Sequence, residues 1–250
     1  MIYRALTLFN LLNQDVLNQD VLVVKGVKIP NFFKKDVKLQ WEFCHQFIEL
    51  YEDWILNPKG HFAYENEQIK ISQDDIVFDC GANMGMFAAY AATQGAKVYC
   101  FEPNEKARKL LTETQELYPN QITIIPKALS NENGKEIFCE TDNIGANHLI
   151  SSIMIDKLPI IDRYEVEVIS LDSFSDENNI FPTYIKIDIE GSEPKMLEGS
   201  KGIIATQNPK VVIAAYHGYN DVRMITKYFQ KFNYNITPQR ENVFIWKNEN

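Results

Sequence analysis

The pattern of apolar and polar positions changes near residue 60. Before that point, apolar side chains recur at steps of four and three, the spacing of one face of an amphipathic helix: Leu39, Phe43, Phe47, Leu50 and Trp54. Asn57-Pro58 should end this helix, because proline disfavours a helical conformation in the residue before it. We therefore predict a helical N-terminal extension over residues 1–60 and a second domain over residues 61–250.

The second domain alternates apolar runs with amphipathic segments, which is typical of a mostly parallel sheet with helices on both faces. Strands are expected at 76–80, 97–102, 121–125, 183–189 and 210–216. Helices are expected at 84–95, at 104–117 with Asn104 as N-cap, and from Asn220 or Asp221, the last with Val222, Ile225, Phe229 and Phe232 on one face. Two final strands, near 233–237 and 242–247, should pair antiparallel around a turn at Pro238.

An excursion over residues 134–169 interrupts this alternation. Its ends, 134–140 and 164–169, have strand patterns, and the stretch between them is polar. A long excursion inside a compact domain is more often a lid or binding loop than filler. We therefore predict substrate contacts from this segment, with disorder as the alternative: Asn147, His148, Ser151 and Ser152.

The most informative motif is a strand, turn and helix at residues 76–85. The strand ends in Asp79-x-Gly81-x-x-x-Gly85, where glycines allow a tight turn and a close approach of ligand to backbone. The next strand ends in Glu102, whose carboxylate can accept hydrogen bonds from both hydroxyls of a ribose. A dinucleotide site needs G-x-G-x-x-G, but Asn83 stands at the second glycine. The motif favours S-adenosylmethionine over NAD, and a turn with no ligand is the simpler alternative.

Charged residues interrupt the expected strand at 183–189. A central parallel strand is normally an uninterrupted apolar run, yet Lys186, Asp188 and Glu190 alternate along one face. An unpaired buried charge is costly, so these groups must pair, meet a ligand or lie at the open strand end. Ligands of open α/β sheets bind at the carboxyl ends of the strands, where Asp188 and Glu190 stand. The alternative is a structural ion pair between Lys186 and Asp188, with Ser192 capping the next helix.

His217 follows the expected strand at 210–216 and should lie at the same edge of the sheet. Because the unperturbed pKa of histidine is near 6.5, this side chain is a candidate proton acceptor at neutral pH. Tyr216, beside it, is a candidate substrate contact. Of the other histidines, His45 is expected to be structural, and His61 lies in a linker.

Composition narrows the classes of partner and location. The chain has 250 residues and a net charge of −9, which disfavours sequence-independent binding to nucleic acid. Its four cysteines show no metal-ligand spacing, and those at 80, 100 and 139 lie in strand patterns, as buried thiols in a reducing cytosol would. No apolar run is long enough to span a membrane, so we expect a soluble, cytoplasmic protein. The oligomeric state is not predicted, and the duplicated Asn-Gln-Asp-Val-Leu at 13–22 has no assigned role.

Five segments together resemble the FkbM-type S-adenosylmethionine-dependent methyltransferases: Val77–Gly85, Val98–Pro103, Lys127–Asn131, Val168–Phe174 and Tyr184–Gly199. They cover roughly residues 64–237 in consistent order, and the last is the most specific. The resemblance implies a Rossmann-like class I methyltransferase fold with a seven-stranded sheet, and transfer of a methyl group, usually to a hydroxyl, in natural-product or glycan pathways. It departs from the family at Ala215-Tyr216, since an acidic residue often stands shortly before the histidine.

Carried over to this sequence, the resemblance implies a cofactor site for S-adenosylmethionine and its product S-adenosylhomocysteine. Asp79, Gly81, Asn83 and Gly85 would surround the methionine part, Glu102 with Pro103 would hold the ribose, and Ala128, Leu129 and Ser130 would edge the adenine. Methyl transfer from a sulfonium is an in-line displacement, so positioning should supply most of the catalysis. We predict His217 as the base and Asp188 or Glu190, with Lys186 nearby, as orienters of the acceptor, directly or through a divalent cation such as Mg²⁺.

The acceptor is the least constrained part of the prediction. The high Asn, Lys and Ile usage is typical of an AT-rich bacterial genome, where sugar O-methylation for surface polysaccharides is a plausible use. A small-molecule hydroxyl acceptor, a sugar or sugar nucleotide, is therefore our first hypothesis. A natural product such as a macrolide is the alternative, as is a binding module that kept the fold and lost the activity. A nucleic-acid methyltransferase is disfavoured by the acidic balance.

Overall fold

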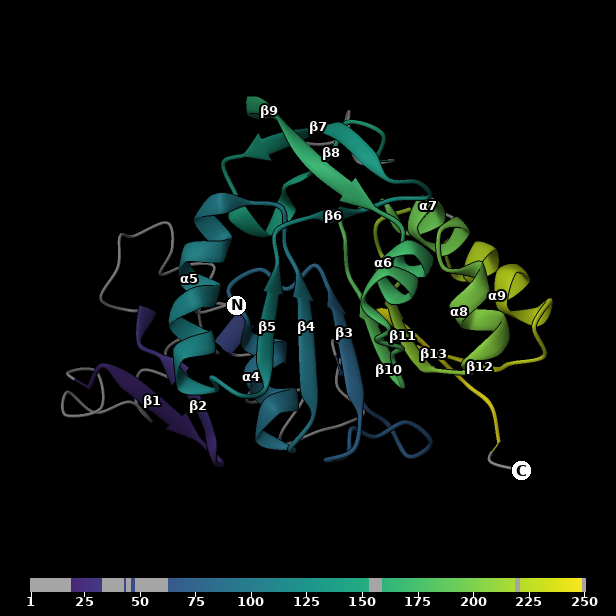
Figure 1. Ribbon diagram of the computed structural model, residues 1–250, viewed down its shortest axis with the longest axis horizontal. Coiled ribbons are helices and arrows are strands. Elements are labelled where there is room, and N and C mark those ends of the chain that lie inside the picture. The colour runs from purple at the N-terminus through teal and green to yellow at the C-terminus, as the bar shows by residue number, and fades with distance from the viewer. Residues whose placement is uncertain are drawn as a thin grey trace.

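The computed structural model describes residues 19–32, 43, 46–47, 63–152, 159–218 and 221–248. Its centre is a seven-stranded sheet with strand order β12-β13-β11-β10-β3-β4-β5 (Figure 1). The parallel strands are β3 (Ile76–Cys80), β4 (Lys97–Phe101), β5 (Ile122–Ile125), β10 (Tyr184–Ile187) and β11 (Lys210–Ala214). The sheet ends in an antiparallel pair, β12 (Asn235–Gln239) and β13 (Asn242–Trp246). The predicted fold class and strand positions are confirmed.

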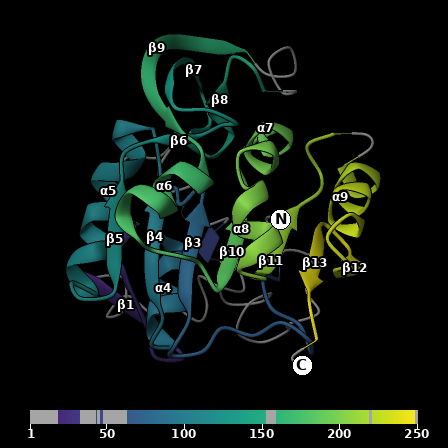
Figure 2. The ribbon, with the colours of Figure 1, turned by 45° about the vertical axis from the view of Figure 1, so that its right-hand side comes forward.

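Helices cover both faces of this sheet, because alternate strand residues point to opposite sides. On one face, Val77 and Val98 pack with α4 (Met86–Thr93) and α5 (Glu105–Leu117). On the other, Phe78 and Ile185 pack with α6 (Leu171–Asn178), α7 (Glu193–Glu198), α8 (Lys201–Thr206) and α9 (Asp221–Gln230) (Figure 2). The sheet is thus buried on both sides, as its apolar strands predict.

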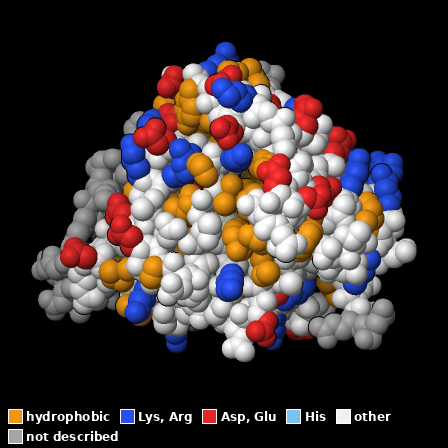
Figure 3. Space-filling view, in the orientation of Figure 1, with side chains coloured by type: hydrophobic (Ala, Val, Ile, Leu, Met, Phe, Trp, Pro, Cys, Tyr) orange, Lys and Arg blue, Asp and Glu red, His pale blue; other side chains and the backbone are white. Residues whose placement is uncertain are grey.

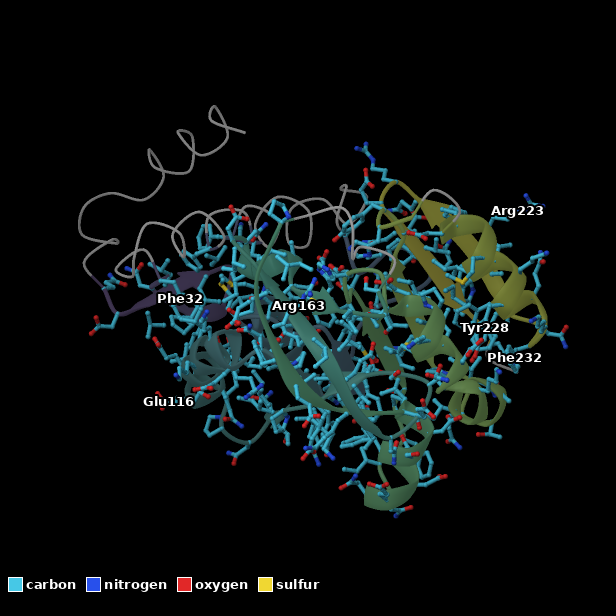
Figure 4. The ribbon with its side chains drawn as sticks, turned by 90° about the horizontal axis from the view of Figure 1, so that it is seen from above. Phe32, Glu116, Arg163, Arg223, Tyr228 and Phe232 are labelled. Carbon is cyan, nitrogen blue, oxygen red and sulfur yellow. The ribbon has the colours of Figure 1, made fainter. Side chains whose placement is uncertain are left out.

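A second, four-stranded sheet lies above the carboxyl ends of β3, β4 and β5 (Figure 1). The arrows of these three strands point toward it in Figure 1. We call it the closing sheet; its order is β6-β9-β7-β8. Its strands are β6 (Ala128–Leu129), β7 (Gly134–Thr141), β8 (His148–Leu149) and β9 (Ile160–Ile169), with a 3₁₀ turn, η3, at Ile144–Ala146. Seen from above, Arg163 of β9 lies over the middle of the molecule (Figure 4). The predicted strands of the excursion are confirmed, and over its described residues the alternative of disorder is not.

The expectation of a helical N-terminal extension is wrong for residues 21–30. β1 (Val21–Val24) and β2 (Val27–Pro30) form an antiparallel hairpin. Lys25 and Gly26 make the turn with φ of 51° and 92°, the left-handed pair that tight hairpins need. The β-branched valines favour strand over helix, and the hairpin packs on α4 and α5.

Part of the predicted helical stripe can be checked. Phe43 and Phe47 are both buried, and Phe43 packs edge-on against Phe32 of the hairpin region. Leu39, Leu50, Trp54 and the Asn57-Pro58 stop lie outside the described residues, as do Cys44, His45, His61 and the first copy of the duplicated pentapeptide.

Three details of the C-terminal region correct the sequence prediction. Pro238 lies within β12 opposite Val243, and the turn is at Arg240, with φ of 55°. Proline is tolerated there because β12 is an edge strand. Val222 of α9 is exposed, whereas Ile225 and Phe229 are buried. Phe232, after the helix, packs on Tyr228 at the outer edge of the molecule (Figure 4).

Helices α6 and α8 were not predicted, because segments of 8 and 6 residues are too short to show a helical period. Helix α7, of 6 residues, was expected only as the helix that follows Ser192. Cys80, Cys100 and Cys139 are free and buried, as expected. Among the described residues, no helix combines the length and apolar character needed to cross a bilayer.

Candidate active site

A cavity of about 1510 Å³ lies between the carboxyl ends of the parallel strands and the closing sheet. Ligands of open α/β sheets bind at this edge. The cavity has two sides. We call the turn from Gly81 to Gly85, together with Glu102, the glycine-turn side, and the residues after β10, Asp188 and Glu190, the acidic side.

The glycine-turn side is fixed by its own backbone. The amides of Gly81 and Ala82 both donate to the carbonyl of Phe101, at 3.1 and 3.2 Å. Gly81 and Asn83 have φ of 84° and 48°, a left-handed conformation that is costly for most side chains. A Cβ on Gly81 would lie 1.9 Å from the carbonyl oxygen of Asp188, so only glycine fits where the two sides of the cavity meet.

Glu102 is anchored by two backbone amides. Its Oε2 accepts from the amide of Asn83 and its Oε1 from that of Asn104, both at 2.8 Å. Burial raises the pKa of Glu102 to about 6, although these hydrogen bonds oppose the rise. The carboxylate therefore links the turn after β3 to the loop after β4 and keeps a fixed orientation at the cavity wall.

The predicted cofactor residues separate into two groups. Lining the cavity are Gly81, Asn83, Glu102, Pro103, Ala128 and Leu129. Asp79, Gly85 and Ser130 are not among its lining residues. Gly85 instead allows close packing, since a Cβ there would lie 2.5 Å from Leu111 of α5. The amide of Ser130 continues the closing sheet by donating to Ile169.

Asp79 is fully buried and pairs with Lys186, whose Nζ lies 3.0 Å from Oδ1. Lys186 also donates to the carbonyl of Gly81 at 2.7 Å. Burial alone would lower the pKa of Lys186, but the charge of Asp79 raises it. The ion pair with Asp188 that was considered as the alternative is thus replaced by a pair with Asp79, and Lys186 holds the glycine turn while it lines the cavity.

The acidic side begins with Asp188, whose carboxylate two tyrosine side chains contact. The hydroxyl of Tyr64 donates to Oδ2 at 3.0 Å, and that of Tyr216 donates to the same carboxylate at 3.1 Å. Tyr64 is itself placed by Tyr184, whose hydroxyl donates to the Tyr64 carbonyl. Asp188, Tyr64 and Tyr216 all line the cavity, so the predicted place of Tyr216 beside the acidic side agrees with the structure.

His217 lies behind this wall and is buried. Its Nε2 is 3.5 Å from both Asp188 and Glu190, and its Nδ1 is 3.0 Å from Glu193. Burial alone would lower the pKa of His217, but the carboxylates of Glu190, Glu193 and Asp188 raise it to about 11. The ring is therefore protonated at neutral pH, and each nitrogen faces a carboxylate.

This placement argues against the prediction that His217 is the base. The side chain is not among those that line the cavity, and a protonated ring has no lone pair to accept a proton. The sequence-based argument assumed an unperturbed pKa, and it missed Glu193, which stands in the first turn of α7. Ser192 occupies the N-cap of α7 without a side-chain capping bond, contrary to the alternative considered for it.

Asp188, Glu190 and His217 form a group in which one atom from each side chain lies within 4.8 Å of the others. Two carboxylate oxygens and an imidazole nitrogen are a donor set for a divalent cation. Without a cation, the protonated ring of His217 can hold the same two carboxylates together by charge.

Besides the glycine-turn side and the acidic side, the closing sheet also bounds the cavity, and residues 141–149 all line it. Asn147 and His148 are therefore at the cavity wall, and their contact with a substrate stays a prediction. Ser151 and Ser152 are not lining residues; the hydroxyl of Ser152 instead donates to the carbonyl of Glu190. The excursion is thus tied directly to the acidic side.

Glu140 of β7 is a cavity residue that the sequence analysis missed. Its Oε1 accepts from Asn104 at 2.8 Å and from the hydroxyl of Tyr164 at 3.1 Å, and its Oε2 accepts from Lys106 at 2.6 Å. Since Asn104 also donates to Glu102, these bonds connect the closing sheet to the glycine-turn side. Side chains of both charges are interspersed over this part of the surface (Figure 3).

Comparison with known proteins identifies the family of this chain. The family model described as the methyltransferase FkbM domain matches residues 79–236. Hexuronic acid methyltransferase AglP of Haloferax volcanii is 30% identical over 156 residues, which are 62% of this chain and 61% of that protein. AMB antimetabolite synthetase AmbE of Pseudomonas aeruginosa is 32% identical over 78 residues, 30% of this chain and 4% of that protein.

A solved structure, methyltransferase FkbM from Methylobacillus flagellatus KT, superposes with a TM-score of 0.56 at 22% identity. The match covers 85% of this chain and 55% of that one, and at this identity it shows the fold alone. The chain thus spans less than two thirds of the length of each of these relatives. Because the family model covers more than half of the chain, the protein belongs to the FkbM methyltransferase domain family.

Proposed function

We propose that this protein is an S-adenosylmethionine-dependent O-methyltransferase that acts on a hydroxyl of a sugar or sugar nucleotide. The observation that carries the proposal is one cavity with a glycine-turn side and an acidic side in backbone contact at Gly81 and Asp188. The family match supports methyl transfer, and the arrangement of side chains supports the division of roles between the two sides.

The residues of the glycine-turn side fit S-adenosylmethionine. Asn83 lines the cavity, and its buried Oδ1 has no hydrogen-bond partner among the described residues, so it can accept from the ammonium of a methionine group. Glu102 lies at the end of β4, where a carboxylate can accept from ribose hydroxyls. When bound, the cofactor would supply an electrophilic methyl group. Gly81, Asn83 and Glu102 would hold it, with Ala128 and Leu129 beside the adenine.

The acidic side fits a hydroxyl acceptor. Asp188 and Glu190 line the cavity beside Gly81, and carboxylate oxygens accept hydrogen bonds from hydroxyls. We propose that they orient the acceptor oxygen for in-line attack, the main requirement of this reaction. As the bond from oxygen to the methyl carbon forms and the bond from sulfur to that carbon breaks, one of these carboxylates would take the hydroxyl proton. Tyr64, Tyr216 and His217 would keep the Asp188 carboxylate in one orientation.

A divalent cation at Asp188, Glu190 and His217 is a second, separable proposal. It rests on the donor set and on the 4.8 Å limit that contains the three ligand atoms. Since the ring of His217 is protonated without a cation, the cation would take the place of the proton on Nε2, while Nδ1 would keep its hydrogen toward Glu193. A cation there would polarise an acceptor oxygen bound to it. Exhaustive dialysis against EDTA should then abolish methyl transfer, and Mg²⁺ or Mn²⁺ should restore it. Full activity after chelation would overturn the cation proposal and leave the carboxylates as direct contacts.

The acceptor class rests on the relative. AglP is named as a hexuronic acid methyltransferase, and it shares 30% identity with this chain over 156 residues. We therefore propose a uronic acid or its nucleotide-linked form as the first acceptor to test. A surface polysaccharide pathway is consistent with this chemistry.

A methyl-transfer screen tests the proposal. The purified protein is incubated with S-adenosylmethionine and, in turn, glucuronic acid, UDP-glucuronic acid, glucose and a macrolide aglycone, and mass spectrometry detects addition of one methyl group. Wild type should methylate a carbohydrate, while Asp188→Asn should not. Exclusive transfer to the macrolide would replace the carbohydrate by a natural product. Binding of S-adenosylmethionine without transfer to any acceptor would favour a binding module.

A further inference from the structure

His148 occupies an unusual position in the cavity wall. It is 1% exposed, it lines the cavity, and within the part of the chain that the structure describes its Nε2 has no hydrogen-bond partner. Leaving a buried polar atom unpaired costs about 1–3 kcal/mol, so such an atom calls for an explanation. A ligand that supplies the missing group is one.

The surrounding backbone fixes the hydrogen-bonding role of this nitrogen. The other ring nitrogen, Nδ1, lies 3.0 Å from the carbonyl oxygen of Ala146. Because a carbonyl oxygen only accepts, Nδ1 carries the hydrogen, and in the neutral ring Nε2 then has a lone pair. The missing partner is therefore a hydrogen-bond donor, such as a hydroxyl.

The segment around His148 is ordered by short-range bonds. Asn147 Oδ1 accepts from the amide of Thr141 at 2.8 Å, and Asn143 Oδ1 accepts from the amide of Gly145 at 3.0 Å. β8 pairs His148 with Cys139 of β7. The ring is thus held in place before any ligand arrives.

His148 also belongs to the acceptor side of the cavity. The amide of Ser152 donates to the carbonyl of Leu149 at 2.9 Å, and the Ser152 hydroxyl donates to the carbonyl of Glu190. This turn joins β8 to the acidic side, whereas Gly81 and Glu102 of the proposed cofactor site lie at the ends of β3 and β4.

We propose that Nε2 of His148 accepts a hydrogen bond from a sugar hydroxyl and so helps to position the acceptor opposite Asp188 and Glu190. The inference rests on the proposed function for the identity of the acceptor. It adds an atom-level contact from the closing sheet, and it gives the excursion a role in selecting ligands with a hydroxyl at that point.

A binding experiment tests this contact without turnover. Glucuronic acid is titrated calorimetrically into protein saturated with S-adenosylhomocysteine, for wild type, His148→Phe, His148→Gln and Ser151→Ala. The phenylalanine keeps a ring but lacks the acceptor nitrogen, while glutamine places an acceptor oxygen near the position of Nε2. Ser151, on the same turn, is exposed and does not line the cavity, so its alanine variant is the matched control.

His148→Phe should weaken sugar binding about tenfold, which is 1.4 kcal/mol, with S-adenosylhomocysteine affinity unchanged within about twofold. His148→Gln should recover much of the loss, and Ser151→Ala should match wild type. Nitrogen-15 spectra should show the Nε2 resonance, assigned from the glutamine variant, moving as glucuronic acid is added.

Equal sugar affinity in wild type and His148→Phe would overturn the inference, as would parallel loss of S-adenosylhomocysteine binding, which indicates a structural role. Failure of wild type to bind the sugar would also overturn it. If the sugar binds through His148 but no methyl group is transferred, the proposed function fails while this contact stands.

Discussion

The two sides of the cavity are built in different ways. The glycine-turn side comes from neighbouring strands, β3 and β4, and main-chain amides hold it, including those that donate to Glu102. The acidic side is assembled from distant segments by side chains. Tyr64 and Asp188, for example, are 124 residues apart in the chain. The difference teaches that a binding turn can be local and rigid while the chemistry opposite it depends on the tertiary fold.

The largest effect is expected where the two sides meet. Gly81→Ala places a Cβ 1.9 Å from the Asp188 carbonyl in a residue with φ of 84°, so it should destabilise the fold by more than about 4 kcal/mol. Chemical denaturation measures this. Gly26→Ala is the control: its φ is 92° but no atom lies within 4 Å, and it should cost about 1–2 kcal/mol. Similar losses in both variants would contradict a close contact between the two sides.

Lys186→Met should have the next largest effect, because it removes the buried partner of Asp79 and the donor to Gly81. Breaking a buried pair from one side should lower the free energy of unfolding by about 3 kcal/mol. Lys135→Met, which breaks an exposed pair with Glu165, should leave the midpoint of denaturation almost unchanged. If both lysine variants unfold at the same denaturant concentration, Lys186 does not hold the turn.

Glu102 should make stability depend on pH. Its pKa is raised from 4.5 to about 6 in the folded protein, so folding favours the protonated carboxyl. The stabilisation is fully present below pH 4.5 and is lost as pH rises through about 6, a change of about 2 kcal/mol. Between pH 4 and 7.5, the free energy of unfolding of wild type should therefore fall by this amount relative to that of Glu102→Gln. Parallel curves would mean that Glu102 titrates normally.

The smallest effect is expected at the rim of the acidic side. Tyr216→Phe removes one hydroxyl from Asp188, while Tyr64 still donates to the same carboxylate. A loss of about 1 kcal/mol, near fivefold in kcat/KM, should follow with no change in S-adenosylmethionine affinity. A weaker cofactor affinity would show that the two sides are not functionally separate.

The same contrast explains what the sequence could predict. Gly81 and Glu102 are recognisable because turn geometry and strand ends are local properties. The cap at Asn104 is confirmed, since its side chain accepts from the amide of Ala107 at 2.8 Å. The hairpin could also have been predicted locally, because Lys25-Gly26 is a turn sequence and the valines on either side of it favour strands.

The acidic side was predicted only in part, because its properties depend on contacts across the fold. Asp188 and Glu190 follow the end of β10 as expected, but the partner considered for Lys186 was Asp188, and the structure pairs it with Asp79. The protonation of His217 could not be foreseen, since it requires three carboxylates from outside its own strand. Nothing in the local sequence around Tyr64 or Glu140 marks either residue as part of the cavity.

The central claim is that one cavity binds S-adenosylmethionine on its glycine-turn side and positions a sugar hydroxyl on its acidic side. The most direct test measures both properties in Asp188→Asn, a variant of the same size. Calorimetry should give an S-adenosylmethionine Kd within about twofold of wild type, while methyl transfer to the sugar falls at least about a hundredfold, which is 2.7 kcal/mol. Undiminished transfer, or loss of cofactor binding in step with transfer, would contradict the account.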